Sequence, residues 1–171
     1  MPNASNKKTA ARKPMAYLLG AALAVVILAA VLLLKPGVPA ARTDAGNKAQ
    51  NGGLRIQIED ISEKATFYPV TVDGVKLEVL AVKAPDGTIR TAFNTCQVCY
   101  DSGRGYYVQE GSVLVCQNCG NRFRTSDVEK VRGGCNPVPI LPENKNVDET
   151  TITIPAEILQ QAKGIFANWK R

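Results

Sequence analysis

The pattern of cysteines is the feature that most constrains what this chain can fold into. Cys96 and Cys99 form one C-x-x-C motif, Cys116 and Cys119 form a second after a gap of sixteen residues, and Cys135 follows in a Gly-Gly-Cys-Asn-Pro turn. A C-x-x-C turn can place two sulfur atoms on one metal ion, with backbone N–H groups of the turn directed at the thiolates. The spacing of the two motifs is typical of four-cysteine metal ribbons, so the sequence predicts a thiolate metal site.

The composition narrows the chemistry of this site because the chain contains no histidine. This excludes Ser/His/Asp and Cys/His catalysis, mixed cysteine-histidine zinc sites, Rieske-type ligation and histidine-ligated haem. Methionine occurs only at Met1 and Met15, which excludes a thioether copper site in the rest of the chain. The carboxylates near the cysteines, Asp101, Glu110 and Asp127, form no spaced acid–base pair. No catalytic residue is predicted, and the chain is not expected to be an enzyme.

Two other interpretations of the C-x-x-C pairs stay open at this point. The four cysteines can form a zinc ribbon whose metal only replaces a hydrophobic core, which would make the chain a structural interaction module. They can also form disulfides, because compartments outside the cytoplasm are usually oxidising. Disulfides across a two-residue gap are strained and reducible, which suits thiol–disulfide exchange better than stapling. A thioredoxin-like enzyme needs a single C-x-x-C at a helix start, whereas both pairs here follow predicted strands.

The residues around the cysteines distinguish the two turns and single out Cys135. Gly120 follows the second pair and admits the backbone conformation that wraps a metal, whereas Tyr100 stands at the corresponding position after the first pair. Gly133 and Gly134 allow close backbone approach, and the following Asn-Pro fixes the turn, so the Cys135 sulfur is expected to be held in a defined position. Three roles are open for it: ligand of a cluster or second metal, redox-active thiol, or small buried residue.

An uncharged apolar segment from Met15 to Leu34 predicts a membrane anchor. At about 1.5 Å rise per residue, its twenty residues cross roughly 30 Å of hydrocarbon. Basic residues gather before the segment and only Lys35 follows closely, so residues 1–14 are predicted to be a basic tail in the cytoplasm. The rest would lie outside, in the periplasm or extracellular space, as part of a single-pass protein of the cytoplasmic or inner membrane. A cleaved signal peptide is the alternative, but its apolar core is usually about 7 to 15 residues.

The segment after the anchor is predicted to be a tether. Pro36 to Gly53 is rich in Pro, Gly, Ala and polar residues without apolar periodicity, so residues 35–53 are assigned as a flexible linker. The net charge of +6 arises mainly from basic residues that flank the anchor, and the remainder of the chain is near neutral. A nucleic-acid partner needs a basic face on the folded domain and is therefore not expected.

Residues 54–171 are predicted to form one extracytoplasmic domain with the fold class mainly β with α (α+β). Alternating apolar residues and turn signals predict a small β-meander that runs into the first cysteine pair, over 54–58, 65–72, 75–83 and 88–93. A cysteine-rich hairpin over 106–109 and 112–115 is expected to bring the two pairs together. Residues 139–147 are expected to be irregular, and 150–154 form a candidate last strand.

A C-terminal amphipathic helix is predicted to bury one of its faces. Pro155 takes the favoured first-turn position of a helix. The apolar residues that recur at helical spacing after it are Ile158, Leu159, Ala162, Ile165, Phe166 and Trp169. Phe166 and Trp169 are therefore expected to belong to the core.

One combination of motifs resembles a known family. It consists of the two C-x-x-C pairs, Gly105-Tyr106 between them, Gly120 after the second pair, and Gly-Gly-Cys-Asn-Pro at 133–137. In this combination the chain resembles the FtrD-like membrane iron-sulfur family over roughly Val70 to Phe166. The resemblance implies a domain outside the membrane that binds an iron-sulfur cluster or another thiolate-held metal and is associated with metal transport systems. It also implies the metal and cofactor ligands, which are Cys96, Cys99, Cys116, Cys119 and Cys135.

The expected function is that of a membrane-anchored metalloprotein. Such a protein would pass electrons or metal ions for a membrane transport or redox system, with a membrane protein as its partner and the lipid bilayer around its N-terminal helix. An iron-sulfur cluster is the expected cofactor, and zinc or copper(I) stay open because five thiolates in an exposed site suit these ions as well. The structural zinc module and the thiol–disulfide exchanger are the alternatives.

Overall fold

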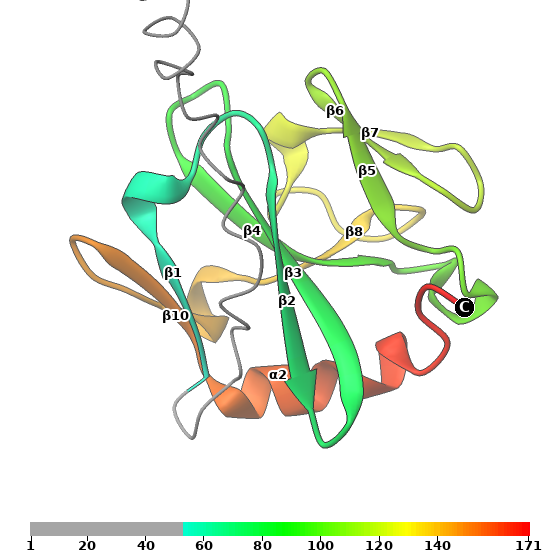
Figure 1. Ribbon diagram of the computed structural model, residues 1–171. Helices are drawn as coiled ribbons and strands as arrows, with labels where there is room; N and C mark the ends of the chain where they lie inside the picture. Colours follow the sequence, from blue (N-terminus) through cyan, green and yellow to red (C-terminus); the bar gives the residue numbers. More distant parts are fainter. Residues whose placement is uncertain (1–52) are drawn as a thin grey trace, which may run out of the picture. The chain divides into compact units, whose positions relative to one another are not determined.

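The computed structural model describes residues 53–171, which form three antiparallel sheets and one short α-helix (Figure 1). The predicted cytoplasmic tail, the anchor and the linker up to residue 52 lie outside the described residues, and their assignment stays a prediction. Within residues 53–171, no helix is long and apolar enough to cross a membrane.

The central sheet contains four antiparallel strands in the order β2-β3-β4-β8. These strands are β2 (Thr66–Val72), β3 (Val75–Lys83), β4 (Ile89–Cys96) and β8 (Pro137–Pro139). The first three form a meander, with Asp73 and Gly74 in the predicted turn between β2 and β3; both have positive φ (48° and 79°). The short β8 pairs with the free edge of β4 and carries the chain away from the Cys135 loop.

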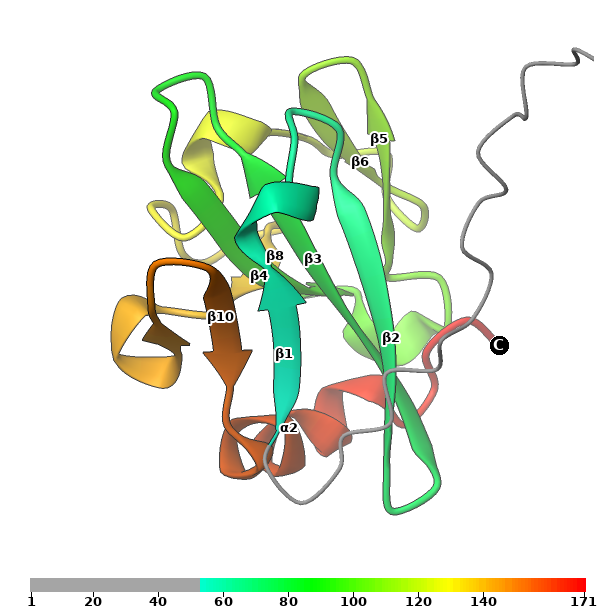
Figure 2. The same ribbon diagram turned by 60° about the vertical axis from the view of Figure 1, so that its left-hand side comes forward.

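A second sheet, in the order β1-β10-β9, leads into the helix. Its strands are β1 (Leu54–Gln57), β9 (Asn146–Val147) and β10 (Thr151–Ile154). The helix α2 (Ala156–Ala162) begins after Pro155 and continues as a 3₁₀ helix over Lys163–Phe166. Figure 2 shows β1 and β10 side by side, with α2 at their end.

The third sheet, in the order β5-β6-β7, carries the second cysteine pair. Its strands are β5 (Tyr107–Glu110), β6 (Val113–Cys116) and β7 (Arg122–Arg124). β5 and β6 are the hairpin predicted between the two cysteine pairs. Short 3₁₀ helices connect the elements at Ile58–Asp60, Tyr100–Ser102, Thr125–Asp127 and Pro142–Asn144.

The central sheet separates two hydrophobic clusters, because successive side chains of a strand point to opposite faces. Leu77 and Val79 of β3 lie in a first cluster with Leu159 of α2 and apolar residues of β1 and β10. Leu80 and Val82 of the same strand lie in a second cluster, which the third sheet covers. The cysteines in this second cluster are the buried Cys96, Cys99 and Cys116, with Cys135 packed against it. The candidate site is therefore built into one of the two cores.

The predicted class, mainly β with α, is confirmed, and three details differ from the prediction. β1 pairs with β10 and not with β2, so the meander begins one strand later than predicted. Residues 139–147 are less irregular than predicted, because they include the end of β8 and all of β9. α2 ends at Ala162, two residues before Gly164, a poor helix former. Phe166 and Trp169 nevertheless pack in the first cluster, as predicted.

Candidate metal centre

The first C-x-x-C pair is placed by the end of β4. Cys96 is the last residue of this strand, and Cys99 lies in the turn that follows. Cys96 pairs with Pro137 of β8, which follows Cys135 by two residues in the chain. The N–H of Cys96 donates to the carbonyl of Gly105 (2.6 Å), which ties the strand end to the chain entering the β5–β6 hairpin.

The turn of the first pair directs a backbone donor at a thiol, as C-x-x-C geometry predicts. The N–H of Cys99 donates to the Cys96 sulfur at 3.4 Å. The chain then enters the 3₁₀ turn Tyr100–Ser102, where the N–H and hydroxyl of Ser102 donate to the Cys99 carbonyl (3.1 and 2.7 Å). Because the chain leaves the turn in this way, Tyr100 does not need positive φ. The absence of a glycine there is thereby explained.

The second pair is placed by the end of β6. Cys116 is the last residue of this strand and lies opposite Tyr107 of β5. Gly120, directly after Cys119, has a φ of 73°, in the left-handed region that favours glycine. Its N–H donates to the Cys116 carbonyl at 2.9 Å and closes the turn. The role predicted for this glycine is confirmed.

Cys135 lies in the loop before β8, and hydrogen bonds tie this loop to both cysteine turns. The Cys135 carbonyl accepts from the Tyr107 hydroxyl (2.8 Å) and from the side-chain N–H of Asn121 (2.7 Å), two residues beyond Cys119. On the other side, Gln97 of the first turn accepts from the N–H of Gly133 (3.1 Å). Cys135 is thus fixed through its backbone.

The two glycines before Cys135 serve a different purpose from the predicted one. Gly133 and Gly134 have φ values of 84° and 65°, and a Cβ at either position would meet open space. They provide left-handed backbone, and the close approach expected from the sequence does not occur there. It occurs instead at Gly105, where a Cβ would lie 2.2 Å from the carbonyl oxygen of Cys99.

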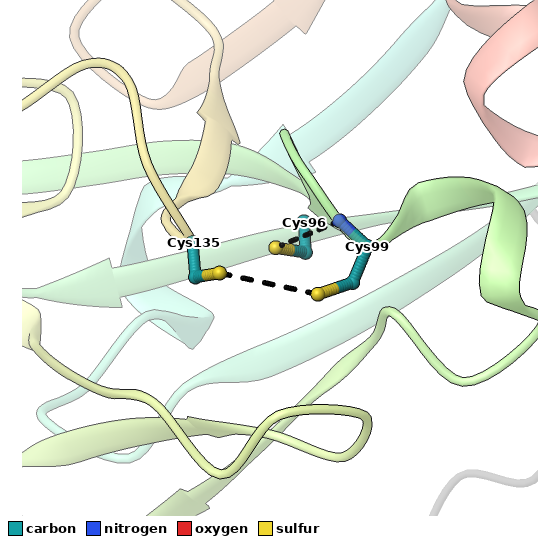
Figure 3. A group of neighbouring side chains, drawn as sticks. All are labelled: Cys96, Cys99 and Cys135. Carbon is teal, nitrogen blue, oxygen red and sulfur yellow. Dashed lines mark hydrogen bonds between the residues drawn. The ribbon is translucent and has the colours of Figure 1, made fainter.

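The five sulfur atoms form two overlapping groups of three. The sulfurs of Cys96, Cys99 and Cys135 all lie within 4.8 Å of one another, and the same holds for Cys99, Cys116 and Cys119. Figure 3 shows the first group, in which the Cys99 and Cys135 sulfurs are 3.9 Å apart. No carboxylate among residues 53–171 joins either group, and all five cysteines are free thiols. The structure thus brings together every cysteine that the sequence singles out.

Burial changes across this assembly. Cys96, Cys99 and Cys116 are buried, Cys135 is half-buried and Cys119 is exposed. One side of the assembly therefore packs into the second cluster, while the side with Cys119 faces solvent. A metal held here would be reachable from outside without any movement of the core.

Two of the five thiols have lowered pKa values. Burial disfavours the thiolate of Cys96, but the nearby Tyr107 hydroxyl and the backbone N–H groups of Cys99 and Val98 outweigh burial, so the pKa is lowered. The backbone N–H of Asn121 donates to the Cys119 sulfur and lowers the pKa of that thiol. These two positions favour the thiolate that a metal needs.

The other three thiols hold their protons more strongly. Burial raises the pKa of Cys116 to about 12 and also raises that of Cys99. At Cys135, the neighbouring Cys119 thiol and partial burial raise the pKa to about 12. Thiolates crowded together in this way repel each other unless a cation lies between them. The assembly is therefore suited to a positively charged metal.

Several residues that position the thiols were not identified from the sequence. Asn94 of β4 accepts a hydrogen bond from the N–H of Tyr107 in β5 (2.7 Å), which fixes β5 against β4. The Asn94 side chain also donates a hydrogen bond to Glu78 of β3 (2.7 Å). Gln97 and Asn121 join the turns to the Cys135 loop. Their partners lie far along the chain, and a polar residue in a turn gives no sequence signal of a distant partner.

A comparison with protein families agrees with the composition of this site. The model of a family described as membrane iron-sulfur containing protein FtrD-like matches residues 61–166, which is more than half of the chain. The matched segment contains all five cysteines and every strand except β1. No curated protein and no solved structure matches the chain.

Proposed function

The chain belongs to the FtrD-like family of membrane iron-sulfur containing proteins, and we propose that it passes electrons or metal ions to a membrane transport or redox partner from outside the membrane. The family and the cysteine assembly together support a metal-binding protein. The choice of metal, the transfer role and the partner are the parts that we propose.

The observation that carries the proposal is the convergence of five thiols at a partly exposed position. Three of them are buried, while Cys119 is exposed and Cys135 is half-buried. A structural zinc site is usually closed, with four ligands around one ion. Here a fifth thiol and an open side provide more than a structural ion requires. This arrangement favours exchange of electrons or metal with a partner over a purely structural role.

The donor set fits an iron-sulfur cluster or another soft metal. Thiolates are the ligands that iron-sulfur clusters, zinc and copper(I) share, and the chain has no histidine to compete with them. The residues that would hold the metal are Cys96, Cys99, Cys116, Cys119 and Cys135. A bound cluster would supply one-electron redox chemistry. The N–H groups of Cys99 and Asn121, which donate to thiol sulfurs, would stabilise the negative charge of the ligands.

The proposed location follows from the sequence outside the described residues. Residues 1–14 would lie in the cytoplasm, 15–34 would cross the membrane and 35–53 would connect to the metal domain outside. Protease added to intact spheroplasts should release a fragment that begins within the linker. A chain that stays uncut until the membrane is lysed would contradict this orientation.

Anaerobic isolation of the full chain in detergent tests the metal. We expect a coloured protein with iron and acid-labile sulfide, and an electron paramagnetic resonance signal in one redox state. The Cys116→Ser/Cys119→Ser double variant should lose both the iron and the signal. A colourless protein that holds one zinc ion per chain would contradict the cluster. Metal-free protein whose cysteine pairs titrate at a defined potential would support the thiol–disulfide exchanger instead.

A further inference from the structure

The segment 165–171 lies against the turn of the first C-x-x-C pair (Figure 1). On the side where β4 enters this turn, the indole N–H of Trp169 donates to the carbonyl of Asn94 at 2.8 Å. The hydroxyl of the neighbouring Thr95 donates to the carbonyl of Ile165 at 3.4 Å. These two contacts hold the two residues of β4 that precede its final cysteine.

The same segment also contacts the chain after the turn. The side chain of Asn168 donates to the carbonyl of Asp101 at 3.2 Å. Gly103 lies so close to the segment that a Cβ there would be 3.1 Å from the carbonyl oxygen of Arg171 and 3.3 Å from that of Asn168. One segment therefore holds the chain on both sides of the first cysteine pair.

A series of polar contacts connects this segment to the β5–β6 hairpin. Lys170 forms an ion pair with Glu78 of β3 (3.0 Å), whose side chain is only 12% exposed. The same Oε1 atom of Glu78 accepts from the side chain of Asn94 (2.7 Å), and Asn94 accepts from the N–H of Tyr107. Lys170 therefore stabilises the carboxylate that orients Asn94 toward the hairpin.

The segment itself lies mostly at the surface. Phe166 is buried in the first cluster, and the half-buried Trp169 packs edge-on against Phe166 (ring centroids 5.4 Å apart) and Tyr106 (6.5 Å). Lys170 is exposed and has a φ of 55°, a conformation that side chains other than glycine rarely adopt. A segment with few buried contacts opens at a lower free-energy cost than the core. This segment can therefore separate from the turn while the two hydrophobic clusters stay packed.

We propose that Trp169 and Lys170 are positioning residues that determine how firmly the first cysteine pair retains a metal. A turn that is free to move loses its metal more easily, and the segment 165–171 opposes this movement on both sides of the turn. The inference rests on the proposed metal-binding function and adds to it a regulation of the same site. The family model ends at residue 166, so both residues lie beyond the part of the chain that it matches.

Labelling of metal-free full chain, in detergent with a thiol reductant, tests the effect on the turn. Lys170→Met removes the cation beside Glu78, and Trp169→Phe removes the donor to Asn94 but keeps an aromatic ring. Each variant should speed the alkylation of the buried Cys99 by about fivefold, the factor expected from the loss of one hydrogen bond. Cys116, which is also buried but belongs to the second pair, should be labelled at the wild-type rate. Equal acceleration at both cysteines, or at neither, would overturn the proposal.

Cadmium release tests the effect on a bound metal. The same metal-free protein is loaded with cadmium, an excess of chelator is added, and the ultraviolet absorption of cadmium–thiolate bonds is followed over time. Lys170→Met and Trp169→Phe should each release cadmium about fivefold faster than the wild type. Lys170→Arg, which keeps a cation beside Glu78, should restore the wild-type rate. Release at the wild-type rate in Lys170→Met and Trp169→Phe would contradict the proposal.

Lys163→Met is the matched control for Lys170→Met. Lys163 precedes the segment by two residues and forms an ion pair of similar exposure with Asp73 (2.7 Å), in the turn between β2 and β3. Its substitution should leave both cadmium release and Cys99 labelling unchanged. If Lys163→Met accelerates them as much as Lys170→Met does, the effect is a general loss of stability and the proposal fails. The iron and sulfide content of isolated protein is independent of these rates, so the proposed metal and the role of the segment can fail separately.

Discussion

The hydroxyl of Tyr107 in β5 donates a hydrogen bond of 2.8 Å to the carbonyl of Cys135, 28 residues further along the chain. Burial raises the pKa of Tyr107, so this hydroxyl stays protonated and able to donate. We predict that Tyr107→Phe lowers the free energy of unfolding by about 1 kcal/mol. It should also speed the alkylation of Cys135 in metal-free protein, because the loop loses one of its two carbonyl donors.

The neighbouring Tyr106 provides a matched control for this substitution. Tyr106→Phe keeps the ring that packs edge-on against Trp169 and leaves the Cys135 loop untouched. Peptide mapping after a brief pulse of alkylating reagent would report the labelling of Cys135 in both variants. Equal labelling rates for the two variants would show that the Tyr107 hydroxyl does not hold the loop.

Gly105 is the position at which a side chain is least tolerable near the centre. A Cβ there would lie 2.2 Å from the carbonyl oxygen of Cys99 and 2.5 Å from its carbonyl carbon. Gly105→Ala should therefore displace the first turn, lower the free energy of unfolding by about 2 to 3 kcal/mol and weaken metal retention. Urea denaturation followed by the fluorescence of Trp169, the chain's one tryptophan, would measure the change. Gly164→Ala, which adds a methyl group in open space, should leave stability and metal binding nearly unchanged.

A nearly buried ion pair holds the segment that leads to the Cys135 loop. Lys145 and Glu129 contact each other with side chains only 6% exposed, and Glu129 also accepts from the N–H (2.8 Å) and hydroxyl (2.7 Å) of Thr91 in β4. Lys145→Met would leave a buried carboxylate without its cation and should lower the free energy of unfolding, measured by urea denaturation, by about 3 to 5 kcal/mol. The double variant Lys145→Met/Glu129→Leu should lower the free energy of unfolding by less than Lys145→Met alone. If the double variant costs the sum of the two single variants, the residues are not coupled.

The sequence was sufficient for the parts of the fold that depend on local patterns. Asp73-Gly74 predicts the β2–β3 hairpin, and the alternation in β3 predicts a strand with the bounds that the structure shows. The alternation is imperfect at Leu80 and Val82 because both faces of this central strand are buried. The pairing of β1 with β10, nearly a hundred residues away, depends on tertiary packing and has no local signal.

Local motifs in the sequence also identify the cysteines of the site, but they do not show which sulfur atoms lie close together in the fold. The C-x-x-C spacing and the Cys135 turn identify the five cysteines, and it is natural to expect each motif to act as one unit. In the structure the first motif meets the second pair through Cys99 and also lies against Cys135, because β8 returns beside β4 and places that loop next to Cys96. This return is a contact between distant strands that no motif describes.

The raised pKa values of two thiols predict how metal binding depends on pH. The pKa of Cys116 and that of Cys135 are each raised from 9.0 to about 12, so both thiols are protonated at neutral pH and a metal must displace these protons. Apparent cadmium affinity should therefore rise with pH by about tenfold per pH unit for each proton displaced, and the rise should continue up to the raised pKa values. Competition with a chelator of known affinity, between about pH 6 and about pH 9, would measure the slope. Cys135→Ser should lower that slope by one proton, whereas an affinity that is flat over this range would contradict the prediction.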